Sequence, residues 1–196
     1  MTFPNPKALL SMALLCAATA SQAVPVFTVD AKLNSSTGGV GLSTVLLTVG
    51  QSFSVFSGIN DLASAGPLPR FSDANGLTGP DRFANALDDS GQPVGTKIGT
   101  NFGLRTQGGL SAPFGALVGQ INPGSFFFLG RAFSGPAPAT GLLKLFYFDS
   151  NGADNTGSYN VSITNNVPST VVPEPETYAL MLAGLTVMGF VTRRQR

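Results

Sequence analysis

Short apolar stretches, each closed by turn residues, run through this 196-residue sequence. Residues 24–172 hold almost no long helix-favouring run, and β-branched and aromatic stretches end at turns such as Asn122-Pro123-Gly124 and Asn151-Gly152. Apolar and polar residues alternate in several stretches, as in a strand with one solvated face. The pattern predicts an all-β antiparallel β-sandwich over residues 24–167, with residues 60–109 as loops and strands at 26–33, 43–49, 52–57, 115–121, 125–129, 142–148 and 158–164.

The composition excludes most of the usual catalytic residue types. The sequence has no histidine, and its single cysteine, Cys16, lies near the N-terminus. Imidazole bases, thiol nucleophiles and the usual zinc ligands are therefore missing from the body, and we expect no enzyme. Residues 24–172 carry seven basic side chains against eight aspartates, a net charge of −1, so no basic patch for nucleic acid is present.

Residues 1–23 read as a secretion signal. Lys7 precedes an apolar run over residues 8–18, and small residues follow up to Ala23. A transmembrane helix is the alternative, but the run is about half of the roughly 20 residues needed to cross a bilayer. We expect cleavage after Ala23, so that Cys16 leaves with the signal and the body is exported.

The other end combines a rigid motif, an apolar segment and a basic tail. Residues 168–176 form a linker that contains Pro173, Glu174 and Pro175, and residues 177–192 form an apolar stretch. As a helix this stretch would span about 24 Å, against a hydrocarbon core of about 30 Å, which makes a marginal membrane anchor. The basic residues of 193–196 should stay in the cytoplasm and place the body outside; they are Arg193, Arg194 and Arg196.

This arrangement resembles the PEP-CTERM sorting signal, with Pro173-Glu174-Pro175 as its motif. The resemblance implies recognition by an exosortase, a membrane-embedded peptidase that cuts near the motif. The protein would be anchored in the membrane through its C-terminal helix before processing, and would then reach the cell surface or extracellular matrix. An ordinary tail anchor is the alternative.

A second group of candidate functional residues lies between the last two expected strands. Asp149, Asn151, Asp154 and Asn155 gather hard oxygen donors on one short loop. Calcium takes six to eight such oxygens, from carboxylates, amides and main-chain carbonyls. A polar hairpin turn without metal is the alternative, because Asn-Gly is common in hairpins.

The body also resembles the calcium-dependent galactose-binding lectins of the PA-I type, on three segments in order: residues 47–55, 115–121 and 145–163. The resemblance implies a lectin- or jelly-roll-like sandwich with calcium held by Asp149, by Asp154 and Asn155 in place of a pair of asparagines, and by the carbonyl of about Ala153. In that family sugar hydroxyls complete the coordination. The family's sugar-binding histidine has no counterpart here, so metal could bind without galactose specificity.

Two functions remain open at this point. The chain is either a secreted domain that binds extracellular polysaccharide through calcium, or a non-catalytic structural matrix protein with neither metal nor sugar. A glycosidase is not favoured, because the adjacent Asp88 and Asp89 would point to opposite faces of a strand rather than face each other across a bond.

Overall fold

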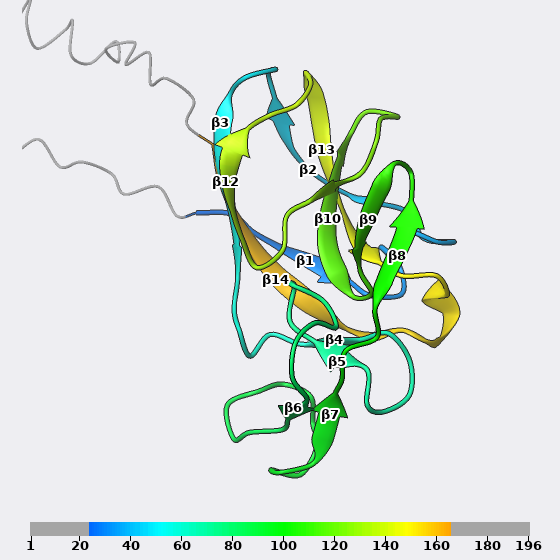
Figure 1. Cartoon of the computed structure of the whole chain (residues 1–196). Coiled ribbons are helices and arrows are strands. Elements are labelled where there is room, and N and C mark those ends of the chain that lie inside the picture. The colour runs from blue at the N-terminus through cyan, green and yellow to red at the C-terminus, as the bar shows by residue number, and fades with distance from the viewer. Residues whose placement is uncertain (1–23, 166–196) are drawn as a thin grey trace, which may run out of the picture.

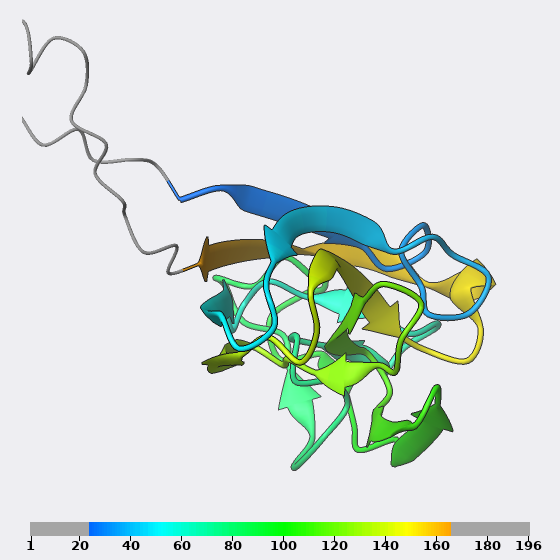
Figure 2. The ribbon, with the colours of Figure 1, turned by 90° about the horizontal axis from the view of Figure 1, so that it is seen from above.

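The computed structural model describes residues 24–165, in which two antiparallel sheets pack face to face and are accompanied by two smaller two-stranded pairs (Figures 1 and 2). The larger sheet runs in the order β12-β3-β14-β4-β5, and β1 also pairs with β14. Its strands are β12 (Ala132–Pro136), β3 (Ser52–Ser57), β14 (Thr156–Asn165), β4 (Ala63–Ser64), β5 (Phe71–Ser72) and β1 (Val26–Asp30). The smaller sheet, β11-β10-β13-β2, consists of β11 (Phe127–Phe128), β10 (Ala116–Ile121), β13 (Gly141–Phe148) and β2 (Leu42–Leu47).

Strand β14 organises the larger sheet. Its inward residues Tyr159, Val161 and Ile163 are buried, and the residues between them point outward, as the two-residue period of a strand requires. Along its ten residues it pairs with β1, with β3 and with β4. The principal core lies between the two sheets; its largest fully buried side chains include Tyr147, Tyr159, Phe53, Leu47, Leu117, Leu143, Leu145 and Ile163.

The outer face of the smaller sheet is also covered. A hairpin of β8 (Leu104–Gln107) and β9 (Leu110–Pro113) crosses it, and Ala112 of β9 packs with the outward side chains of β10 and β13. The ring of Phe126 meets the rings of Phe146 and Phe148 edge-on, with centroids 5.2 and 6.0 Å apart. Strand β13 is therefore apolar on both faces, which explains its nearly continuous run of hydrophobic residues.

The predicted all-β antiparallel sandwich is confirmed, but the expectation of loops over residues 60–109 is wrong. That region holds β4, β5 and β8, the first strand of the β8–β9 hairpin, together with the pair β6 (Arg82–Phe83) and β7 (Lys97–Gly99). A small core of Leu62, Ala84 and Ile98 supports it. These strands are mostly two or three residues long, too short to show an alternating pattern in the sequence.

Other strand boundaries shift. The expected strand at 52–57 is observed as β3, whereas β1 stops at Asp30 because the side chain of Asp30 accepts hydrogen bonds from the backbone of Lys32 and Leu33 and starts a turn. Strand β11 keeps only two of five expected residues. Strand β12 was not expected, since it contains Gly135-Pro136; it is an edge strand, where a proline is tolerated.

The targeting segments lie outside the described residues, as do the cleavage position Ala23 and the linker and tail over 168–196. Within residues 24–165 no helix is long and apolar enough to cross a membrane. The signal at 1–23 and the membrane segment at 177–192 stay predictions.

Candidate metal site

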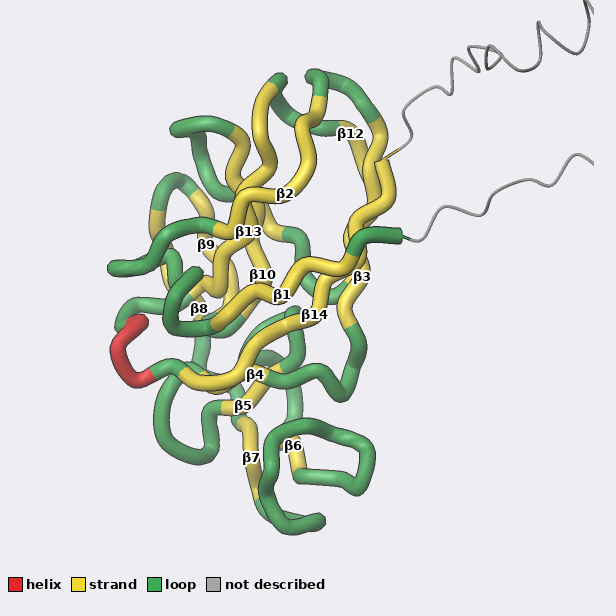
Figure 3. The backbone as a smooth tube through the Cα atoms, turned by 180° about the vertical axis from the view of Figure 1, so that it is seen from behind, coloured by secondary structure: helices red, strands yellow, loops and turns green. Residues whose placement is uncertain are grey.

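The loop between β13 and β14 is shaped by its own polar side chains. A single 3₁₀ turn, η1 (Gly152–Asp154), occupies its middle and is the red segment of Figure 3. The side chain of Asn151 accepts a hydrogen bond from the Ala153 amide at 3.2 Å, and the Asn151 amide donates to Oδ2 of Asp149 at 3.1 Å. These local bonds are typical of Asx turns and fix the backbone around the candidate ligands.

A second loop, residues 31–41, braces the first one. Oγ of Ser36 lies 3.1 Å from the carbonyl oxygen of Asp149, to which it donates, and accepts from the Asp149 amide at 3.2 Å. The backbone of Ser36 donates to the Tyr147 carbonyl at 2.8 Å. Asp149 therefore leaves the end of β13 with its backbone held on both sides.

Asn155 is buried, and only part of its side-chain amide is hydrogen-bonded. It is only 2% exposed, and its Nδ2 donates to the main-chain carbonyl of Ala31 at 3.0 Å. Its Oδ1 is buried and has no hydrogen-bond partner within residues 24–165. A buried polar atom without a partner costs about 1–3 kcal/mol, so this oxygen is an acceptor that residues 24–165 leave unsatisfied.

Asp149 is buried next to this amide. The side chain is 3% exposed, and burial raises the pKa of its carboxyl above the ordinary value. Contact with the Asn155 side chain and with backbone amides lowers that pKa, whereas the nearby charge of Asp154 raises it. The structure thus brings together Asp149, Asp154 and Asn155, as the sequence predicted, with Ala153 in the turn between them.

The tip of the β4–β5 hairpin borders the same loop, which the sequence did not predict. At Gly66, whose φ is +127°, an added Cβ would come 2.9 Å from Oδ2 of Asp154 and 3.2 Å from Nη1 of Arg70. The glycine lets Asp154 and Arg70 approach this backbone closely. Nearly ninety residues separate Gly66 from Asp154, and the pairing of β4 with β14 brings the two segments together.

The donors at this site are all hard oxygens, which suits calcium or a similar cation. The carboxylates of Asp149 and Asp154 and the guanidinium of Arg70 together carry a net charge of −1. In the described part of the chain no group of three His, Cys, Asp or Glu side chains could hold a metal. An ion here would therefore depend on the amide Oδ1 of Asn155, on main-chain carbonyls and on ligand hydroxyls besides the two aspartates.

A surface groove lies on the other flank of the loop. Its volume is about 530 Å³, and Asn151, Gly152 and Ala153 form one wall. The opposite wall comes from the 31–41 loop and includes Lys32 and the exposed Leu33 and Val40. The groove offers room for a ligand next to the candidate cation.

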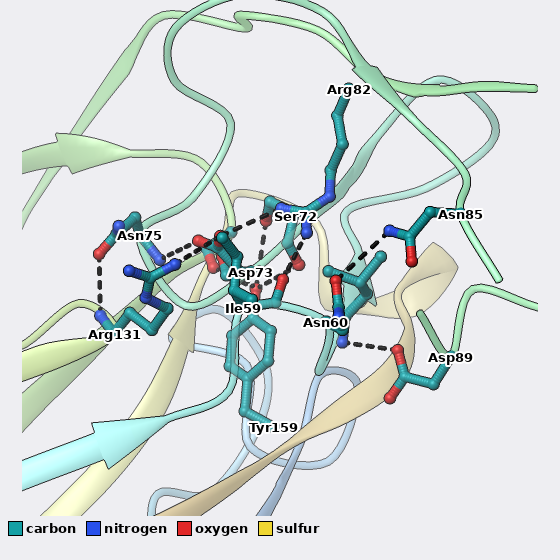
Figure 4. Close-up of polar contacts among 12 residues, drawn as sticks. Ile59, Asn60, Ser72, Asp73, Asn75, Arg82, Asn85, Asp89, Arg131 and Tyr159 are labelled. Carbon is teal, nitrogen blue, oxygen red and sulfur yellow. Dashed lines mark hydrogen bonds and ion pairs between the residues drawn. The ribbon is translucent and has the colours of Figure 1, made fainter. Parts of the chain in front are cut away.

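A separate polar cluster, shown in Figure 4, has a structural role. Oδ2 of Asp73 lies 3.0 Å from Nη1 of Arg82 and 3.9 Å from Nη1 of Arg131, and its Oδ1 accepts from the Asn75 amide at 2.9 Å. Arg82 also donates to the Ile59 carbonyl. Because these groups satisfy one another, the cluster ties the 60–109 region to the sandwich. The polar cavity beside it, of about 370 Å³, lacks an unpaired acceptor comparable to that of Asn155.

Comparison with known proteins concerns first the C-terminal end. Residues 171–196 match the family described as the PEP-CTERM protein-sorting motif. The chain carries a PEP-CTERM sorting signal. The match confirms the resemblance found in the sequence, and it includes Pro173, Glu174, Pro175 and the terminal arginines. A PEP-CTERM signal implies export, exosortase processing in general and sorting to the cell surface.

For the body of this PEP-CTERM chain, one solved structure that matches is described as "EclA N-terminal domain; PllA-like lectin". It is 20% identical, the match covers 71% of this chain and 94% of that one, and the TM-score is 0.45. No curated protein matches the chain.

Proposed function

We propose that this exported chain is a non-catalytic glycan-binding protein that holds its ligand through calcium. Asp149, Asp154 and Asn155 would supply side-chain oxygens, and Ala153 a main-chain carbonyl. The observation that carries the proposal is the buried Oδ1 of Asn155, which lacks a partner in the described chain and belongs to an amide in contact with Asp149.

Calcium would supply a strong positive centre on which two neighbouring sugar hydroxyls can act as ligands. The chain's own part is to hold the oxygens in place before binding. The Ser36 contact fixes the backbone of Asp149, and the Asn151 amide fixes its carboxylate. The bond to Ala31 fixes the amide of Asn155. A preorganised set of this kind loses little conformational entropy when an ion and a sugar arrive.

Position in the molecule favours an outward-facing site. Strand β14 begins at Thr156, next to the candidate ligands, and ends at Asn165, where the described chain leaves for the sorting signal. Ten strand residues span about 33 Å. The candidate site therefore lies at the opposite end of β14 from Asn165, the last described residue.

The sorting signal would act first and the glycan-binding site afterwards. The signal would be cut after Ala23, and the apolar helix at 177–192 would anchor the chain until an exosortase-type peptidase acts. The released domain would bind extracellular polysaccharide at the cell surface or in the matrix, and the PEP-CTERM signal supports this destination. The sequence resemblance to PA-I type lectins supports a glycan as ligand.

Binding to immobilised polysaccharide of the producing cell, and to a panel of glycans, tests the function. The protein should bind in calcium and lose most of its binding in a chelator. Asp149→Asn should bind at least about tenfold more weakly, since it removes a charged ligand, whereas Asp81→Asn, at an exposed carboxylate paired with Lys97, should bind normally. Glycan binding that persists in chelator would overturn the calcium part. No binding under either condition would favour a structural matrix protein.

A further inference from the structure

The end of the sandwich from which both chain termini leave forms a distinct surface, here named the exit pole. It consists of the turns at 48–51, 122–126 and 137–140 and the strand ends at 24–26 and 162–165. Val26 pairs with Ser162, so the first and last described strands are neighbours, and the two ends of the described chain lie on the same side of the molecule in Figures 1 and 2.

Hydrogen bonds join the three turns into one surface. The Gly50 amide donates to the Ala137 carbonyl at 2.9 Å, and the Val49 amide donates to Oγ1 of Thr140 at the same distance. Nδ2 of Asn122 donates to the carbonyl of Thr140 at 2.6 Å. The pole is therefore a continuous face of fixed shape rather than a set of independent loops.

This face has no charge and exposes aliphatic side chains. Residues 24–165 contain fifteen charged side chains, yet none lies in the segments of the exit pole. Val49 is 62% exposed, Val26 is 64% exposed, and Leu46, just before the first turn, is 70% exposed. An apolar groove of about 250 Å³ lies between the second and third turns and is lined by Ile121, Gly124, Ser125, Phe126, Phe127, Pro138 and Ala139.

The length of the outgoing chain brings this face close to the membrane. Between Asn165 and the apolar segment at 177–192 there are 11 residues. Even fully extended they reach only about 40 Å, and any less extended path brings the pole closer. An uncharged face can approach the headgroups without the desolvation cost of buried charge.

We propose that the exit pole rests on the lipid bilayer while the sorting segment is still attached. The aliphatic side chains of the pole enter the interface, and the candidate metal site faces away from the membrane. The contact is weak, because few side chains take part, but the tether makes it intramolecular and so raises the effective concentration. Cleavage near the PEP-CTERM motif removes the tether, and the domain then leaves the surface without any change in its fold.

Site-directed fluorescence on the full chain in vesicles tests this arrangement. The vesicles contain equimolar phosphatidylethanolamine and phosphatidylglycerol, some of it brominated to quench fluorescence. A Cys16→Ser background leaves no other cysteine, so a fluorophore can be placed by Val49→Cys on the pole or, as a control, by Val94→Cys. Val94 is similarly exposed, at 70%, and lies in the loop between β6 and β7 at the other end of the molecule (Figure 1).

The proposal predicts that brominated lipid quenches the label at position 49 about twofold or more, since an interfacial side chain sits about 5–10 Å into the headgroup and acyl boundary. The label at position 94 should be unaffected, and protease removal of the C-terminal segment should abolish quenching at position 49. Equal and weak quenching at both positions, or failure of the chain to float with vesicles, would overturn the proposal. So would shielding of position 49 in detergent without lipid, which would point to a second copy on this face. None of these outcomes depends on calcium or sugar.

Discussion

The side-chain amide of Asn155 donates to the carbonyl of Ala31 at 3.0 Å, across 124 residues of sequence. This bond turns the amide so that its nitrogen is used within the fold and its oxygen is left buried without a partner in the described chain. Folding therefore carries the cost of one unsatisfied acceptor next to Asp149. A cation at this position would offset that cost, which is the physical basis of the proposed function.

Replacing Arg70 should strengthen calcium binding. The guanidinium lies beside Asp154 at Gly66, where its positive charge opposes a cation. Near a protein surface the repulsion is worth about 0.5–1 kcal/mol, so Arg70→Met should lower the calcium Kd by roughly two- to fivefold at low salt. Calcium titration at two salt concentrations measures this. Arg131→Met, whose charge faces Asp73 instead, serves as the control, and equal effects of the two variants would speak against a cation beside Asp154.

The two buried tyrosines should respond differently to loss of their hydroxyls. The hydroxyl of Tyr159 donates to the Gly115 carbonyl at 2.7 Å, whereas that of Tyr147 is buried without a partner in the described part of the chain. Tyr159→Phe should therefore lower the free energy of unfolding by about 1–2 kcal/mol, whereas Tyr147→Phe should leave it unchanged or raise it, because it removes a buried hydroxyl that costs about 1–3 kcal/mol while it lacks a partner. Urea denaturation compares the two variants, and a larger loss for Tyr147→Phe would contradict the hydrogen-bond assignment.

The same pair should limit stability at alkaline pH. Burial raises the pKa of the Tyr147 and Tyr159 phenols well above their ordinary value of 10.0. A raised pKa in the folded state means that the stabilisation is complete below about pH 10 and is lost as the pH rises above it, since only the unfolded chain ionises there. The urea midpoint, followed from pH 8 to 11.5, should stay level and then fall above about pH 10. A flat profile to the end of the range would show that the phenols ionise in the folded protein.

Asp73 should matter more for stability than an exposed aspartate. It accepts from Arg82 at 3.0 Å and from the Asn75 amide, and its side chain is 12% exposed. Asp73→Ala should cost about 2–4 kcal/mol, because two arginines then lose a largely buried partner. Asp81→Ala removes an exposed pair with Lys97 and should cost about 0–1 kcal/mol. Denaturant titration measures the free energy of unfolding of both variants. A similar loss in the two would mean that the Figure 4 cluster contributes little to stability.

Some elements of the fold could be predicted because their pattern is local. Strand β3 was placed correctly, since Phe53, Val55 and Ser57 alternate with outward residues in a stretch bounded by glycines. Strands β4 and β5 could not, because two-residue strands carry no period and exist only through pairing with β14 and with each other. Strand β12 was missed since a sequence ending in Gly135-Pro136 has the chemistry of a turn.

The candidate site could also be predicted only in part from the sequence. Asp149, Asp154 and Asn155 fall within seven residues, so their proximity follows from the sequence alone. The bond to Ala31 and the approach of Gly66 with Arg70 depend on which strands pair, and no local signal in the sequence specifies either contact.

Isothermal titration calorimetry with calcium on the purified chain tests the central claim most directly. The account predicts one calcium site, together with a melting temperature that rises by roughly 5–10 °C at calcium concentrations far above its Kd. Asn155→Ala should abolish both effects, and Asn160→Ala, at an exposed asparagine of the strand that follows, should retain them. No heat and an unchanged melting temperature at millimolar calcium in the unsubstituted protein would contradict the account.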